Sequence, residues 1–147
     1  MLNHELLITL DRQGVEWPDS YNRDELLDKV VQIKPLLERV LNVSLELDAS
    51  AQDATFTCNL GCLQDDSGNR RQDYSVCLTF SNFGKLCLVW GEQEWLARHN
   101  TAISAAATIL TEHGFAPVRP HEIGDIYDGD HDEWVGLTWL DRFFAHY

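Results

Sequence analysis

The chain has 147 residues, of which 44% are hydrophobic, and 24 acidic side chains against 11 basic ones give it a formal net charge of −13. This length and apolar content predict one folded domain over residues 1–147, and they exclude a chain that is disordered throughout. The charge repels phosphate backbones and anionic lipids, so we expect neither a nucleic-acid nor a membrane partner. It favours a basic protein partner, or it serves solubility alone.

The N-terminal region carries no targeting signal. Residues 1–10 have no basic segment and no long apolar stretch, so a signal peptide is not predicted. No run in the chain approaches the ~20 apolar residues of a membrane helix. We therefore expect a cytoplasmic protein. Residues 5–10 form a short apolar run that fits a strand or a helix, and residues 17–20 are typical of a loop.

The first clear helix is predicted to begin after Asn22. Asn22 followed three residues later by Glu25 is a capping-box pattern, and apolar residues then recur at spacings of four and three, as on one face of a helix. Pro35 interrupts this helix, because it has no N–H to donate to the carbonyl of Val31. The sequence thus predicts either a kink at Pro35 or two short consecutive helices. The apolar face comprises Leu26, Val30, Ile33, Leu37 and Val40.

Between residues 43 and 90 the apolar residues recur with a period of two, which is typical of strands with one buried face. Polar turns at residues 65–69 and 82–84 separate successive runs. Strands joined by short turns pair antiparallel, so we predict a meander of about four strands within an α+β fold. The alternating residues are Val43, Leu45 and Leu47, then Phe56, Cys58, Leu60 and Cys62, then Tyr74, Val76, Leu78 and Phe80, and finally Leu86, Leu88 and Trp90.

The four cysteines fall in these predicted strands. Cys58 and Cys62 are four residues apart, so in a strand their side chains point the same way at a separation of roughly 13 Å. That separation is too large for a shared zinc ion or a disulfide. We therefore predict that Cys58, Cys62, Cys77 and Cys87 are reduced core residues, and we expect no metal and no cofactor.

A second helix is predicted over residues 92–113, with an apolar face that matches the meander, so we expect it to pack on one face of the sheet. Gly114 follows as a C-terminal cap. Residues 115–126 are irregular or a short extended piece. A short helix that closes the core is predicted within residues 134–147, where the buried aromatic residues are Trp139, Phe143 and Phe144.

The most acidic stretch of the chain holds its densest group of candidate functional side chains. Asp128, Asp130 and Asp132 have the alternating spacing of the first three ligands of a calcium loop. Such a loop needs glycine at its sixth position and glutamate at its twelfth, where this chain has Glu133 and Trp139. An EF-hand is therefore excluded. Three alternatives remain: a solvated acidic loop, an acidic surface that binds a protein, and a looser metal site that uses His121 or His131.

Trp134 is a candidate anchor for such a partner, because tryptophan beside acidic residues is typical of a protein-binding hot spot. Packing of Trp134 into the core is the alternative. Residues 114–147 carry seven acidic and two basic residues, a local charge of −5, which favours a basic partner. The predicted partner-binding residues are Asp125, Asp128, Asp130, Asp132, Glu133 and Trp134.

The sequence contains no catalytic signature, and we predict a protein that is not an enzyme. The enzymatic alternative is a small metal-assisted hydrolase that uses His121, Asp128, Asp130 and His131, but their spacing is irregular and no nucleophile accompanies them. A third class is an adaptor subunit of a larger assembly, which the sequence does not distinguish from a protein that binds a basic partner. The sequence does not determine the oligomeric state.

Three segments carry a resemblance to a known class of proteins: residues 78–86, residues 127–129 and residues 138–144, which read LTFSNFGKL, YDG and TWLDRFF. They resemble small bacterial immunity proteins found beside polymorphic or contact-dependent toxins. The resemblance implies a small acidic α+β protein that neutralises a cognate toxin by binding it tightly, and we expect this toxin to be basic and of the nuclease type. It carries over no binding residues, because such interfaces differ from pair to pair.

Overall fold

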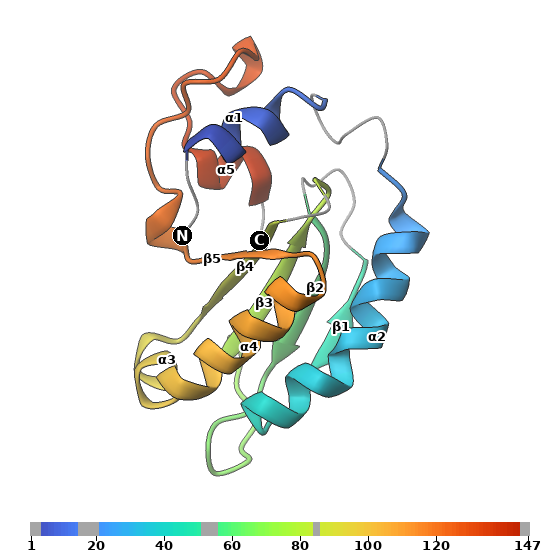
Figure 1. Cartoon of the computed structure of the whole chain (residues 1–147). Helices are drawn as coiled ribbons and strands as arrows, with labels where there is room; N and C mark the ends of the chain where they lie inside the picture. Colours follow the sequence, from blue (N-terminus) through green and yellow to red (C-terminus); the bar gives the residue numbers. More distant parts are fainter. Residues whose placement is uncertain (1–3, 15–20, 51–55, 84–85, 145–147) are drawn as a thin grey trace.

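The computed structural model describes residues 4–14, 21–50, 56–83 and 86–144. Its strands form one five-stranded sheet in which they follow one another in chain order (Figure 1). The first four strands pair antiparallel, which confirms the predicted meander. The fifth strand lies parallel to the fourth, within residues 115–126, for which the sequence left an irregular and an extended structure open. The strands are β1 (Glu46–Asp48), β2 (Phe56–Cys62), β3 (Val76–Ser81), β4 (Leu86–Gly91) and β5 (Ala116–Val118).

The helix α2 (Arg23–Leu41) packs against the sheet through the predicted apolar stripe. It begins after Asn22, whose side chain accepts a hydrogen bond from the backbone N–H three residues on, as predicted. The helix continues through Pro35 as one element rather than two. Pro35 lies on the exposed side, where water can satisfy the carbonyl that loses its partner. At the end of the stripe Leu41 is buried in place of Val40, which is only partly buried.

The helix predicted at residues 92–113 is two helices, α3 (Gln93–Arg98) and α4 (Asn100–Glu112). The break falls at His99, whose ring nitrogen lies 2.9 Å from the carboxylate of Asp66 in the β2–β3 connection. This tertiary contact stabilises the break between the two helices. The periodicity of apolar residues in the sequence does not predict it. Gly114 ends α4 with a φ of +87°, as predicted for a C-terminal cap.

The second face of the sheet is covered by α1 (His4–Asp11) and α5 (Trp139–Phe144), which lie side by side in Figure 1. α4 packs on the first face, as predicted for the helix at residues 92–113, and the undecided run at residues 5–10 belongs to a helix on the second face, for which the sequence made no prediction. Trp139, Phe143 and Phe144 are buried, as predicted. Two 3-10 turns lie between β5 and α5, namely η1 (Pro120–Glu122) and η2 (Asp132–Trp134).

The polar side chains on the second face of the central strands can be buried because they hydrogen-bond to one another. Thr79 is fully buried, donates to Asn59 Oδ1 at 2.5 Å and accepts from Trp90 Nε1 at 2.9 Å. These pairs satisfy groups whose burial would otherwise be costly. An alternation of apolar and polar residues is thus compatible here with a sheet that is buried on both sides.

Within the described ranges, no helix combines the length and the apolar composition that crossing a membrane would require. The loop predicted at residues 17–20, with Trp17, lies outside those ranges.

Candidate partner-binding surface

The acidic stretch forms a hairpin-like loop over residues 125–138, which we call the acidic hairpin. Ile126 and Thr138 form an antiparallel bridge at its base, and the N–H of Tyr127 donates to the carbonyl of Leu137 at 2.7 Å. Figure 1 shows this segment in orange to red, beside α1 and at the opposite end of the molecule from α3. All six predicted partner-binding residues belong to this segment.

The five carboxylates of this prediction are exposed, but they fall into two groups. Asp128 accepts a hydrogen bond from Trp139 Nε1 at 3.2 Å and lies 3.2 Å from His4 Nε2. Asp130 is paired with Arg12 at 3.0 Å. In the part of the chain that the structure describes, the other three side chains make no hydrogen bond or ion pair. These unengaged carboxylates are Asp125, Asp132 and Glu133.

Trp134 is half-buried and packs against the cluster formed by α1 and α5. Its ring lies 5.2 Å from the guanidinium carbon of Arg142, and its Nε1 is buried without a hydrogen-bond partner among the described residues. Trp134 is therefore partly packed, between the two alternatives that the sequence left open, and the structure does not test its role as an anchor.

The exposed apolar residues of the hairpin are aliphatic, and the sequence analysis missed them. Ile126 and Val135 are each 70% exposed and Leu137 is 41% exposed. These three residues lie on one short segment, and exposed apolar patches commonly mark protein-binding surfaces. Their signal in the sequence was their isolation among acidic and polar neighbours, outside any helical or strand-like periodicity.

A cavity of about 250 Å³ opens where the base of the hairpin meets α1 and η1. Its walls combine apolar groups with carboxylates, so it offers both an apolar surface for methylene groups and negative charge for a cationic head group. The lining residues are His4, Leu7, Glu122, Asp125, Ile126, Asp128 and Trp139.

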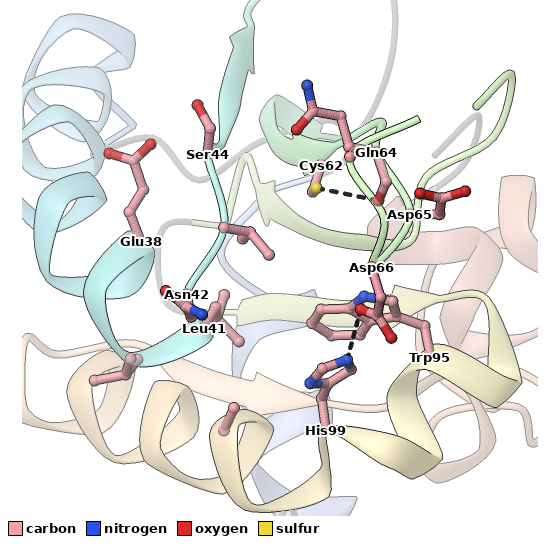
Figure 2. A pocket seen from close by; sticks show the side chains of 14 residues that line it. Glu38, Leu41, Asn42, Ser44, Cys62, Gln64, Asp65, Asp66, Trp95 and His99 are labelled. Atoms are coloured by element: carbon pink, nitrogen blue, oxygen red, sulfur yellow. Dashed lines mark hydrogen bonds and ion pairs between the residues drawn. The ribbon is translucent and has the colours of Figure 1, made fainter. Parts of the chain in front are cut away.

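A larger cavity, of about 650 Å³, lies at the other end of the molecule, between the end of α2, the β2–β3 connection and α3 (Figure 2). His99 packs on the Trp95 ring with centroids 4.0 Å apart and bonds to Asp66, and this hydrogen bond is the main reason that the pKa of Asp66 is lowered. The Cys62 thiol bonds to the carbonyl of Gln64 at 3.6 Å. The charged groups of this cavity are therefore engaged in structural contacts.

The residues of the hydrolase alternative are not assembled into one centre. His131 Nε2 donates to the backbone carbonyl of Asp11 at 2.9 Å, while Asp128 and Asp130 make the separate contacts given above. Among the described residues, no group of three or more His, Cys, Asp or Glu is placed to hold a metal ion.

The four cysteines are buried free thiols in the strands. Burial raises the pKa of Cys58 and of Cys77 to about 12, and it raises the pKa of Cys87 as well. Thiols with such pKa values remain protonated at neutral pH and are poor nucleophiles and poor metal ligands.

The chain matches no family model, and neither the curated proteins nor the solved structures contain a significant match to it.

Proposed function

We propose that this protein is a non-catalytic binding protein that engages a basic protein partner through the acidic hairpin. The observation that carries the proposal is the combination of three exposed aliphatic residues and three unengaged carboxylates on one segment. Apolar groups supply burial in an interface, and surrounding charges supply orientation and specificity. The residues concerned are Ile126, Val135 and Leu137 with Asp125, Asp132 and Glu133.

The cavity at the base of the hairpin supports a partner that presents lysine or arginine. A long basic side chain can lay its methylene groups on Ile126 while its charged end meets Asp125 and Glu122. Arginine fits this arrangement best, because its planar guanidinium can bond to two carboxylates at once.

The partner that we propose is a basic toxin domain, and the role is that of a cytoplasmic immunity protein. Toxins that act on nucleic acids carry positive surfaces for the phosphate backbone, and an acidic inhibitor both accelerates its encounter with such a surface and competes with the phosphates for it. The net charge of −13 and the resemblance to immunity proteins support this role.

The proposal is tested with two triple variants that each remove three negative charges. The site variant, D125N/D132N/E133Q, neutralises carboxylates that make no structural contact in the described part of the chain. The control variant, D28N/D73N/E112Q, neutralises three exposed carboxylates outside the hairpin that likewise make no ion pair there. A partner captured from cells of the source organism should be basic, and calorimetry should show that only the site variant binds it about tenfold or more weakly.

Two results would contradict the proposal. Equal losses of affinity in both variants would show that net charge, rather than this surface, governs binding. Unchanged affinity in the site variant would place the interface elsewhere on the molecule.

A further inference from the structure

We propose that Asp11, at the end of α1, is the positioning residue of the acidic hairpin. Its buried carboxylate, paired with Arg142 of α5, receives polar groups from residues 127–131 and holds the hairpin in the conformation that a partner meets. The inference rests on the proposed function for what the hairpin binds, but not for what holds the hairpin in place.

The pair between Asp11 and Arg142 forms a fixed point on the second face of the sheet. Arg142 Nε donates to Asp11 Oδ1 at 2.8 Å, and both side chains are 0% exposed. Arg142 Nη2 also donates to the carbonyl of Gly14 at 2.7 Å, and its guanidinium lies 4.6 Å from the centre of the Phe83 ring. The carboxylate is therefore held by the helix at each end of the chain and cannot follow the hairpin if the hairpin moves.

The hairpin reaches this fixed point through three of its residues. The Tyr127 hydroxyl donates to the Asp11 carboxylate, with distances of 2.9 and 2.8 Å to the two oxygens, and the backbone N–H of Asp130 approaches Oδ2 at 3.4 Å. His131 adds two bonds: its N–H donates to the Tyr127 oxygen at 2.9 Å, and its ring donates to the Asp11 carbonyl at 2.9 Å. Every one of these contacts joins the hairpin to Asp11 directly or through Tyr127.

Gly129 is needed at the centre of this arrangement. A Cβ at this position would collide with the Asp11 carboxylate and with the Tyr127 hydroxyl group. The backbone of the hairpin thus approaches the carboxylate more closely than a residue with a side chain could.

Apolar burial supplies little further anchoring, because apart from Tyr127 only Trp134 of the hairpin packs against the second cluster, and Trp134 is half-buried. Of all residues in the hairpin, Tyr127 is the only one that is buried, and it is the residue that bonds to Asp11. The large aliphatic residues, Ile126, Val135 and Leu137, face solvent. A carboxylate at the C-terminal end of a helix is disfavoured by the helix dipole and by desolvation. A role of Asp11 in fixing one conformation of the hairpin explains why a carboxylate is buried at the end of α1.

The test uses Tyr127→Phe, which removes the hydroxyl that links the hairpin to Asp11 and leaves the ion pair intact. The matched control is Tyr21→Phe, which removes a hydroxyl that bonds to Thr57 Oγ1 at 2.9 Å. Hydrogen exchange is followed at the amides of residues 127 and 134, which donate to backbone carbonyls within the hairpin and not to the hydroxyl.

We expect exchange at these amides to accelerate about tenfold or more in Tyr127→Phe, while the amides of β2 to β4 keep their protection. Tyr21→Phe should leave the hairpin unchanged. In a double-mutant cycle, D11A/Y127F should exchange no faster than D11A alone, because D11A already removes the oxygens that accept from the Tyr127 hydroxyl. Where D11A does not fold, the comparison of the two tyrosine variants still tests the positioning role.

Unchanged exchange in Tyr127→Phe would overturn the positioning role, whatever the partner is. Faster exchange together with unchanged affinity for the captured basic partner would leave the positioning role standing and would instead overturn the hairpin as the interface. The two proposals therefore fail by different observations.

Discussion

Trp134 and Ile126 lie in the same acidic surroundings, yet their burial gives them different roles. The Trp134 ring covers the buried Arg142 guanidinium, so its removal would expose a charge that is packed against aromatic rings. Ile126, at 70% exposure, covers little and can be shortened without opening the core. A substitution at Ile126 can therefore change binding without changing stability, whereas a substitution at Trp134 would change both.

We predict that I126S/V135S binds the partner more weakly by about 2 kcal/mol or more, because apolar groups at the centre of an interface carry much of its binding energy. The melting temperature should hardly change, since both side chains are exposed. Val31→Ser, at a residue of α2 that is 53% exposed, is the control for loss of an exposed aliphatic group. Affinity and thermal melts measured on the same samples check both statements, and equal weakening by Val31→Ser would contradict the first.

At the scale of elements, α2 and the antiparallel strands could be predicted because their local pattern agrees with their environment. The stripe of α2 continues from Leu26 to Leu41, and the start of the helix is marked by Asn22, whose cap is present in the structure. β5 is harder to predict from sequence, since it has three residues and one of them is Pro117. The sequence did not reveal that the second face of the sheet is covered, because polar residues such as Thr79 and Asn59 lie on it. They can be buried because they hydrogen-bond to each other.

The candidate surface could be predicted in part for the same kind of reason. A run of acidic residues is visible in any sequence, and the structure keeps these residues together. The anchor is not visible in this way, because Asp11 and Tyr127 are 116 positions apart and no local pattern relates them. The division of the carboxylates into engaged and unengaged groups likewise depends on partners such as Arg12 that are distant in sequence.

The anchoring of the hairpin should weaken at alkaline pH. Burial, aided by the nearby Asp11 carboxylate, raises the pKa of Tyr127 to about 12 from an ordinary value of 10.0. Below pH 10 the hydroxyl is neutral in the folded and unfolded states, so its contribution is fully present. Between about pH 10 and 12 the unfolded chain loses the proton first, so this contribution of at most ~3 kcal/mol declines as the pH rises.

Urea unfolding of the wild-type chain and of Tyr127→Phe between pH 9 and about pH 11 checks this expectation. The free energy of unfolding of the wild type should fall more steeply, because other groups with raised pKa values, such as Tyr74 and Cys77, titrate equally in both proteins. Parallel curves would contradict the alkaline shift of Tyr127.

At the scale of the whole molecule, the sheet separates two hydrophobic clusters, each of which contains different helices. One cluster joins the sheet to α2 and α4, and the other joins it to α1 and α5. The acidic hairpin packs on the second cluster, at the end of the molecule away from α3 (Figure 1). A partner at the hairpin therefore meets the layer that contains both terminal helices, while α2 and α4 stabilise the sheet from behind.

The charge of the whole molecule should act on the rate at which the complex forms. Salt shortens the range of electrostatic attraction, from a Debye length of about 10 Å at 0.1 M to about 3 Å at 1 M. We therefore predict that the association rate constant for the basic partner falls steeply with added sodium chloride, while the dissociation rate constant, set by short-range contacts, changes little.

Surface plasmon resonance across this range of salt, with the two triple charge variants, separates the local from the global effect. Both variants carry a net charge of −10, since each removes three of the charges that sum to −13. If the hairpin directs the encounter, D125N/D132N/E133Q should associate more slowly than D28N/D73N/E112Q at low salt and should show a flatter salt dependence, and the two should converge as screening becomes complete. Coinciding curves at every salt concentration would show that attraction is spread over the whole surface, because only the position of the removed charges differs between the two proteins.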